Sequence, residues 1–315
     1  MKYFKIVFMG TPDFAVPVLE KLISDGHVIL AVVTQPDRKS GRGKTVSFSP
    51  VKKIALKNNL KVMQPEKIRK KEVVEKIKEF NPELFVTCAY GQILSQEVLD
   101  IPKFGCINVH ASLLPKYRGA APIHRAIMNG DKITGITTMM TDMGIDTGDI
   151  LLKAVVEIGE NTTSDELHDI LMKTGAELIS KTLLKLGDGN LVRTPQDDGK
   201  STHAPMLKKD EGIINWNSDS KSIHDKVRAL NPWPGCFTEY MKKRMRIISS
   251  GFSNAERQRI PGTITSIDKE KMEIACGTGY LYIYKLQFEN GKPMEISQCW
   301  HNMKSGVVLG QGDKQ

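Results

Sequence analysis

The sequence predicts an α/β protein, with a Rossmann-like, doubly wound, mostly parallel sheet followed by a smaller OB-like β-barrel domain. Over the first 189 residues, short apolar runs alternate with amphipathic helical patterns, which is typical of a parallel sheet covered on both faces. The last part has several short apolar runs separated by Gly, Asp and Asn, which favours a small barrel. A length of 315 residues suits about two domains.

The strands of the first sheet are predicted from short apolar runs that end at polar residues or glycine. These runs are residues 5–9, 28–34, 62–63, 84–90, 106–110, 135–140 and 150–158. Helices are predicted over 50–57, over 71–80 and from residue 163 or 164 to Gly187, each from apolar residues at helical spacing. Thr11-Pro12-Asp13 is predicted to cap a further helix that ends at Gly26.

The stretch 190–206 is polar and has no periodicity, so it is predicted to be a linker. It would separate a domain of residues 1–189 from a second domain of residues 207–315. In the second domain a helix is predicted near 222–230. Its strands are predicted at 246–249, 263–267, 273–276 and 280–286.

Composition narrows the class of protein. No apolar run approaches the roughly 20 residues that cross a bilayer, and the first ten residues lack the pattern of a signal peptide, so we expect no membrane association. The five cysteines are scattered without a C-x-x-C pair, which indicates reduced thiols in a cytoplasm and neither a zinc site nor disulfides. The net charge of +9 is diffuse and favours a polyanionic partner. We expect a monomer.

Two polar residues share one face of the strand predicted at 106–110. Asn108 and His110 alternate with apolar residues near the strand's carboxyl end, where open α/β sheets place their sites. One interpretation is that both are satisfied inside a sheet edge. The other is catalysis, because an asparagine amide stabilises an oxyanion and a histidine moves protons near neutral pH.

An acidic, glycine-rich loop follows a later strand and carries Asp142, Asp146 and Asp149. One of these could meet His110 across the top of the sheet and orient its imidazole. No nucleophilic side chain is then required, and the chemistry suggested is direct transfer of an acyl-type group to an external amine. The alternative, with Ser112 as nucleophile, is weaker because Gly-x-Ser-x-Gly is missing.

The glycine pattern argues against nucleotide cofactors. After Gly10 the next glycine is Gly26, so the G-x-G-x-x-G of dinucleotide-binding folds is absent, and no P-loop pattern is present. We also expect no metal.

Two groups of cations stand out from the diffuse positive charge. The first lies on a hydrophilic loop and consists of Arg38, Lys39, Arg42 and Lys44. The second consists of Lys242, Lys243, Arg244 and Arg246. Both are interpreted either as solvated surface segments or as contacts to a nucleic-acid backbone.

Several motifs resemble the 10-formyltetrahydrofolate-dependent formyltransferases. These are Asn108-Val-His110, Ser112-Leu-Leu-Pro115, Arg118-Gly-Ala-Ala-Pro122 and Met143-Gly-Ile-Asp-Thr-Gly-Asp149. Others are similar to the members that act on initiator methionyl-tRNA, namely Met9-Gly-Thr-Pro-Asp-Phe-Ala15, Thr34-Gln-Pro-Asp37, Gly41-Arg-Gly-Lys44 and Asn231-Pro-Trp-Pro234. The resemblance covers nearly the whole chain and is weakest over the last 60 or so residues.

The resemblance implies a set of roles by position. Asn108, His110 and Asp146 match the catalytic trio. The folate-binding residues would be Ser112, Leu113, Leu114 and Pro115, with Tyr90, Gly91 and the loop at 143–146 around the pterin. The loop with Arg38, Lys39, Arg42 and Lys44 would enter the tRNA acceptor arm, and Lys242, Lys243 and Arg244 of the second domain would contact the same tRNA. The implied reaction uses 10-formyltetrahydrofolate to make N-formylmethionyl-tRNA for translation initiation.

Two rival functions remain at this stage. One is a formyltransferase acting on a glycinamide ribonucleotide or a sugar nucleotide, although a small substrate needs neither basic segment. The other is a non-enzymatic tRNA- or RNA-binding protein, against which the joint presence of Asn108, His110 and Asp146 weighs.

Overall fold

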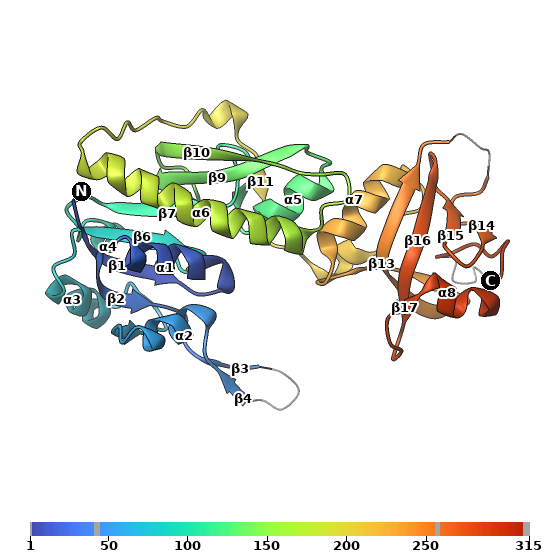
Figure 1. Ribbon diagram of the computed structural model, residues 1–315, viewed down its shortest axis with the longest axis horizontal. Helices are drawn as coiled ribbons and strands as arrows, with labels where there is room; N and C mark the ends of the chain where they lie inside the picture. The colour runs from blue at the N-terminus through green and yellow to red at the C-terminus, as the bar shows by residue number, and fades with distance from the viewer. Residues whose placement is uncertain (1, 41–44, 256–258, 311–315) are drawn as a thin grey trace. The chain divides into compact units, whose positions relative to one another are not determined.

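The computed structural model describes residues 2–40, 45–255 and 259–310 (Figure 1). The chain divides into two compact units, and each is described by itself. The first consists of Met1–Pro122, Ile133–Glu157 and His168–Ala204, and the second of Ile123–Lys132, Ile158–Leu167 and Pro205–Gln315. Two short segments of the range 1–189 therefore pack with the second unit.

A seven-stranded sheet forms the centre of the first unit. In spatial order its strands are β10 (Ile150–Glu157), β9 (Ile133–Met140), β7 (Cys106–His110), β6 (Leu84–Cys88), β1 (Lys5–Gly10), β2 (Val28–Val33) and β5 (Val62–Met63). From β7 to β5 neighbouring strands are parallel, whereas β9 and β10 are antiparallel additions. The predicted mostly parallel sheet is confirmed.

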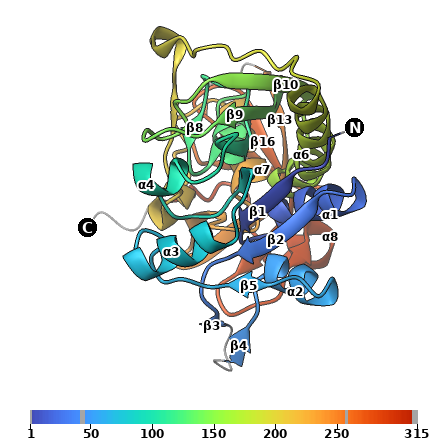
Figure 2. The same cartoon turned by 90° about the vertical axis from the view of Figure 1, so that its left-hand side faces the viewer.

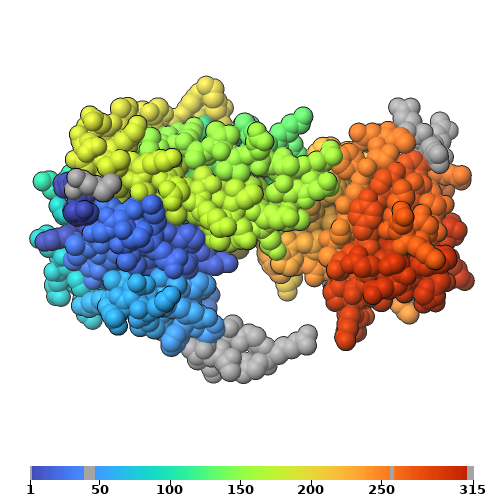
Figure 3. All heavy atoms as spheres, in the orientation of Figure 1, coloured from blue at the N-terminus to red at the C-terminus, as the bar shows by residue number. Residues whose placement is uncertain are grey.

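Helices cover both faces of this sheet. Figure 2 shows α1 (Val16–Ser24) and α6 (Ser164–Gly187) on one side and α3 (Lys71–Glu79) and α4 (Gln96–Leu99) on the other. The outer side of α6 forms part of the surface in Figure 3. Beneath α3 and α4 lies a core cluster that includes Val7, Val33, Ile77, Phe85 and Val98, all fully buried. The near-continuous apolar strands follow from this double cover.

The prediction that Thr11-Pro12-Asp13 caps the first helix was wrong. A 3-10 turn, η1 (Asp13–Ala15), precedes α1, and its N-cap Pro12 supplies no side-chain cap. The hydroxyl of Thr11 instead donates to the carbonyl of Tyr90 at 3.1 Å. This contact is available because β1 and β6 are neighbours, so the loops after them meet where the strand order reverses.

The first basic segment is a short hairpin rather than an open loop. Its strands are β3 (Arg38–Ser40) and β4 (Thr45–Ser47). At its start, the carboxylate of Asp37 pairs with Lys52 of α2 (Pro50–Lys57) and accepts from Gln64 Nε2 at 2.8 Å. Hydrogen bonds from Lys52 and then Gln64 lower the pKa of Asp37, which keeps this anchor charged.

The stretch that we expected to be a linker packs against the first unit as far as Ala204. Thr194 forms a bridge with Ile150, and a 3-10 turn, η2 (Asp198–Lys200), follows. Strand β11 (His203–Ala204) then pairs in parallel with β8 (Arg118–Gly119).

The second unit is built on an antiparallel sheet, which confirms the predicted separate β domain. Its strands in order are β12 (Cys236–Tyr240), β13 (Lys243–Ser253), β16 (Tyr280–Phe288), β15 (Met272–Ala275) and β14 (Ile264–Ile267), with β17 (Met294–Glu295) beside β16. Its helical elements are most of α5 (Pro122–Met128), η3 (Lys209–Gly212), α7 (Ser220–Leu230), α8 (Ile296–Cys299) and η4 (Trp300–Asn302). Asp219 caps α7 by accepting from the backbone of Ser222.

The cysteines are free and buried. Burial raises the pKa of Cys106 to about 11 and those of Cys236 and Cys276 to about 12, so these thiols stay protonated near neutral pH.

Within the described residues, no helix is long and apolar enough to cross a membrane. Nor does this part of the chain bring three or more His, Cys, Asp or Glu together as metal ligands.

The buried contacts of α3 predict a measurable contribution to stability. Ile77→Ala should lower the free energy of unfolding by about 2–5 kcal/mol, because it removes fully buried methyl groups and leaves a cavity. Ile93→Ala is the matched control, since that side chain is 75% exposed and should change stability by less than about 0.5 kcal/mol. Urea denaturation measures both, and equal losses would contradict this account of the core.

Candidate active site

Asn108 lies on β7 with its side chain set by the neighbouring strand. Thr87 of β6 pairs with Asn108 in the sheet, and its hydroxyl donates to Asn108 Oδ1 at 2.9 Å. Because the amide oxygen of Asn108 is occupied by this bond, the amide nitrogen faces Asp146. Asn108 Nδ2 lies 3.5 Å from Asp146 Oδ1. The amide hydrogens are therefore presented on the same side of the strand as His110.

His110 is 6% exposed, and both of its ring nitrogens face acceptors. Nε2 lies 3.0 Å from the carbonyl oxygen of Tyr117, and Nδ1 lies 3.5 Å from Asp146 Oδ2. A carbonyl oxygen can only accept, so Nε2 is the donor in that bond. The ring is thus oriented from two sides.

Asp146 is the aspartate that meets these residues, although it does so from an unexpected direction. Met140 at the end of β9 pairs with Ile107 near the start of β7, because the two strands are antiparallel. The loop at 141–149 therefore begins beside the amino-terminal end of β7 and folds back over the face of that strand. We had predicted that it would cross the carboxyl ends of the strands. Asp146 Oδ2 also accepts from the backbone nitrogen of Gly119 at 2.8 Å.

Asp142 has a different task in the same loop. Its carboxylate accepts from the backbone nitrogen of Gly144 at 3.0 Å and from the hydroxyl of Thr147 at 2.7 Å. These bonds stabilise the turn of the loop itself. No contact of Asp149 with Asn108 or His110 is found among the described side chains.

The Ser112–Pro115 segment is a tightly bonded turn after β7. Ser112 Oγ donates to the carbonyl of Lys116 at 2.6 Å, and its own carbonyl accepts from Thr137 Oγ1 at 2.7 Å. Leu114 is fully buried and precedes a cis peptide bond to Pro115, whereas Leu113 and Pro115 are half-buried. Since the Ser112 hydroxyl is engaged within its own turn, the geometry gives no support to a Ser112 nucleophile.

Tyr90 contributes backbone rather than side chain to the edge of the sheet. Its ring lies in the core cluster at 4% exposure, and burial raises the pKa of its phenol. Its carbonyl accepts from Thr11 Oγ1 at 3.1 Å and from Gln35 Nε2 at 3.2 Å. The following Gly91 is exposed with φ +83, a backbone conformation that favours glycine.

Three residues of this site received no role in the prediction from sequence, although Arg118 belongs to one of the motifs that resemble the formyltransferases. Thr87 holds the Asn108 amide, and Gln196 and Arg118 hold the loop of Asp146. Thr87 could have been identified from the sequence, because it is a polar residue near the end of the apolar run that precedes the strand of Asn108. Gln196 gave no signal, because one glutamine in a polar stretch has no periodicity to mark it.

The predicted cations lie in both units. In the first unit Arg38 is exposed on β3, whereas Arg42, Lys44 and the side chain of Lys39 lie outside the described residues. In the second unit Lys242 is exposed in the turn after β12, and Lys243 and Arg244 are exposed at the start of β13. The Arg244 guanidinium stacks 3.6 Å from the ring centroid of Phe237.

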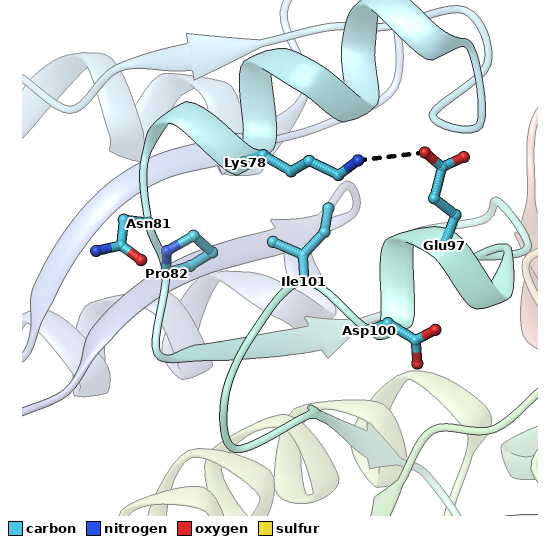
Figure 4. A pocket seen from close by; sticks show the side chains of 6 residues that line it. All are labelled: Lys78, Asn81, Pro82, Glu97, Asp100 and Ile101. Carbon is cyan, nitrogen blue, oxygen red and sulfur yellow. Dashed lines mark hydrogen bonds and ion pairs between the residues drawn. The ribbon is translucent and has the colours of Figure 1, made fainter.

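Two surface hollows lie away from Asn108, His110 and Asp146. One, of about 400 Å³, is drawn in Figure 4 and is lined by Lys78, Asn81, Pro82, Glu97, Asp100 and Ile101. An ion pair between Lys78 and Glu97 spans it, and it contains none of the predicted site residues. The other, of about 270 Å³ in the second unit, includes Arg244 and Arg246 in its lining.

Sequence profiles of known families match both parts of the chain. The family described as formyl transferase matches residues 4–183, and its C-terminal domain matches residues 206–304. The chain therefore belongs to the formyltransferase family, and the protein is an enzyme of that class.

Relatives of known name extend this result over the full length. The chain is 50% identical over 310 residues to the methionyl-tRNA formyltransferase of Acetivibrio thermocellus, covering 98% of this chain and 100% of the relative. It is also 50% identical over 312 residues to the protein of the same name from Ruminiclostridium cellulolyticum, with the same coverage of both chains. An N-formyltransferase of Helicobacter canadensis, solved with folinic acid and dTDP-3-aminofucose, shares the fold at TM-score 0.65 and 22% identity, covering 89% of this chain and 98% of that one.

The contact between Thr87 and Asn108 predicts a specific loss of formyl transfer. Thr87→Val keeps the side-chain shape but removes the hydroxyl that orients the amide, and should lower kcat about five- to tenfold, as expected for about 1 kcal/mol. Thr134→Val is the matched control, because the hydroxyl of Thr134 is buried without a hydrogen-bond partner among the described residues. Equal rates for the two variants in a steady-state assay would rule out this role.

Proposed function

We propose that this enzyme transfers the formyl group of 10-formyltetrahydrofolate to the free amino group of methionine on initiator methionyl-tRNA. The observation that carries the proposal is the meeting of Asn108, His110 and Asp146 on one face of β7, in a chain that matches named relatives from end to end. The product would be N-formylmethionyl-tRNA, used to initiate translation.

The proposed chemistry is direct attack by the amine. Its nitrogen forms a bond to the formyl carbon, and the formyl oxygen takes the negative charge of a tetrahedral intermediate. Asn108 Nδ2 would donate to this oxyanion, and so would a ring N–H of His110, which must turn from its present acceptor to the formyl oxygen, while Asp146 orients the ring. The bond from the formyl carbon to the folate nitrogen then breaks, and a water carries the proton of the amine to that leaving nitrogen.

The folate would lie beside this trio, at the edge where β1, β6 and β7 end. Ser112, Leu113, Leu114 and Pro115 would contact it from a turn that hydrogen bonds already hold. The backbone around Tyr90 and Gly91 would line the pterin pocket, together with the loop at 143–146. The set of groups in this site requires neither a metal nor a nucleotide cofactor.

The tRNA would meet the protein through cations on two hairpins. Arg38, Lys39, Arg42 and Lys44 would contact the acceptor arm, and Lys242, Lys243 and Arg244 a further part of the backbone. Arg and Lys side chains suit the phosphates of a nucleic-acid backbone. We also propose that the boundary between the catalytic and tRNA-binding domains lies near Ala204, and that the enzyme acts as a cytoplasmic monomer.

The oxyanion role of Asn108 predicts a loss of rate rather than of binding. Asn108→Ala should lower kcat about 10²–10³-fold with little change in the KM for methionyl-tRNA, since the amide acts on charge that develops in the transition state. Asn190→Ala, an exposed asparagine of the same unit, serves as control. A variant that mainly raises the KM for tRNA would contradict the assignment. Transfer from 10-formyltetrahydrofolate to charged initiator tRNA is the assay.

The acceptor-arm role of Arg42 predicts a change that depends on salt. Arg42→Ala should raise the KM for methionyl-tRNA about tenfold and reduce the slope of log affinity against log salt by about 1, because one phosphate contact is lost. Arg69→Ala removes an exposed cation of the first unit that belongs to neither basic segment, and it should leave the slope unchanged. If both variants behave alike, the basic hairpin has no specific role in tRNA binding.

A further inference from the structure

The side chain of Gln196 uses its full capacity for hydrogen bonds. Nε2 donates to the backbone carbonyls of Asp146 at 2.8 Å and Gly148 at 2.7 Å. Oε1 accepts from Arg118 twice, at 2.9 Å from Nη2 and 3.1 Å from Nε. An amide has two N–H donors and one oxygen with two lone pairs, so Asp146, Gly148 and Arg118 together satisfy all of them.

Arg118 and the residue after it hold Asp146 from two ends. The Arg118 side chain is 8% exposed and reaches the Asp146 backbone through Gln196. The backbone nitrogen of Gly119 donates directly to the Asp146 carboxylate at 2.8 Å. Strand β8 therefore fixes both the main chain and the side chain of this aspartate.

The loop needs such support because its own conformation is unfavourable. Asp146 has φ +55, and a non-glycine residue in this region costs about 1–3 kcal/mol. Residues 142–145 of the same loop are exposed, so little apolar packing compensates. Gly148 passes so close to the carbonyl of Met140 that a Cβ there would collide with it. Polar contacts are what remain to keep the loop over β7.

We propose that Gln196 and Arg118 are positioning residues for formyl transfer, which hold Asp146 at the distance where it orients His110 and Asn108. This inference rests on the proposed function. Neither side chain contacts Asn108 or His110 among the hydrogen bonds of the described residues, and Gln196 reaches only the backbone of Asp146. Neither is therefore expected to touch the reacting atoms.

Gln196→Glu separates this role from a merely structural one. The carboxylate keeps the shape of the side chain and still pairs with Arg118, so the segment at 190–204 stays attached. It has no N–H to donate to the carbonyls of Asp146 and Gly148, so the loop alone is released. Asp197→Asn is the matched control, because it changes the neighbouring exposed carboxylate and retains an N-cap for η2.

The experiment is a steady-state assay with a double-mutant cycle. Gln196→Glu should lower kcat about a hundredfold, the loss expected from a displacement of about 1 Å, with both KM values within about twofold of wild type. In an Asp146→Asn background the same change should cost little, because Gln196 acts through Asp146. Arg118→Ala should likewise lower kcat in the wild-type enzyme and cause little further loss in the Asp146→Asn background.

A second readout does not depend on the reaction. Amide hydrogen exchange over residues 141–149 should accelerate in Gln196→Glu and not in Asp197→Asn, with unchanged exchange in β7. Additive rate losses in the cycle, an unchanged kcat or unaltered exchange would each overturn the inference. If wild type itself fails to formylate methionyl-tRNA, the proposed function is rejected, and the exchange data still decide whether Gln196 holds the loop.

Discussion

The carboxylate of Asp146 is the point on which the candidate site depends. It accepts from Gly119 and lies 3.5 Å from both Asn108 and His110, so one residue sets the orientation of the other two. Asp146 belongs to a loop that starts beside the amino-terminal end of β7 and returns over the face of that strand. The rest of the first unit provides the surface on which this loop rests.

Polar side chains join neighbouring segments around this point. Thr137 and Gln196 donate to backbone carbonyls, and Thr87 donates to the side-chain amide of Asn108. Buried polar groups are costly when unpaired, so such bonds select one arrangement of the loops rather than simply adding stability. A transfer that needs an oxyanion stabilised over a short distance benefits from this rigidity.

The cationic segments follow a different rule. Arg38 and Arg244 are exposed on strands of two hairpins, and each hairpin has a further contact beside its cation. The ion pair of Asp37 with Lys52 anchors the first, and Phe237 lies beneath the Arg244 guanidinium in the second. Exposed cations on anchored strands suit a large anionic partner, whose backbone is bound by charge more than by shape.

The sequence by itself determined the strands of the seven-stranded sheet, the division into an α/β part and a β part, and the candidate pair Asn108 and His110, because periodicity and alternation are local properties of the chain. It did not predict β12 or the short strands β3, β4, β8, β11 and β17. Which of the three aspartates reaches His110 was decided by tertiary structure, since the antiparallel pairing of β7 with β9 sets where the loop begins. The same holds for Gln196, which is far from Asp146 in the chain. Its role exists only because β11 lies beside β8 and brings a polar segment against the loop.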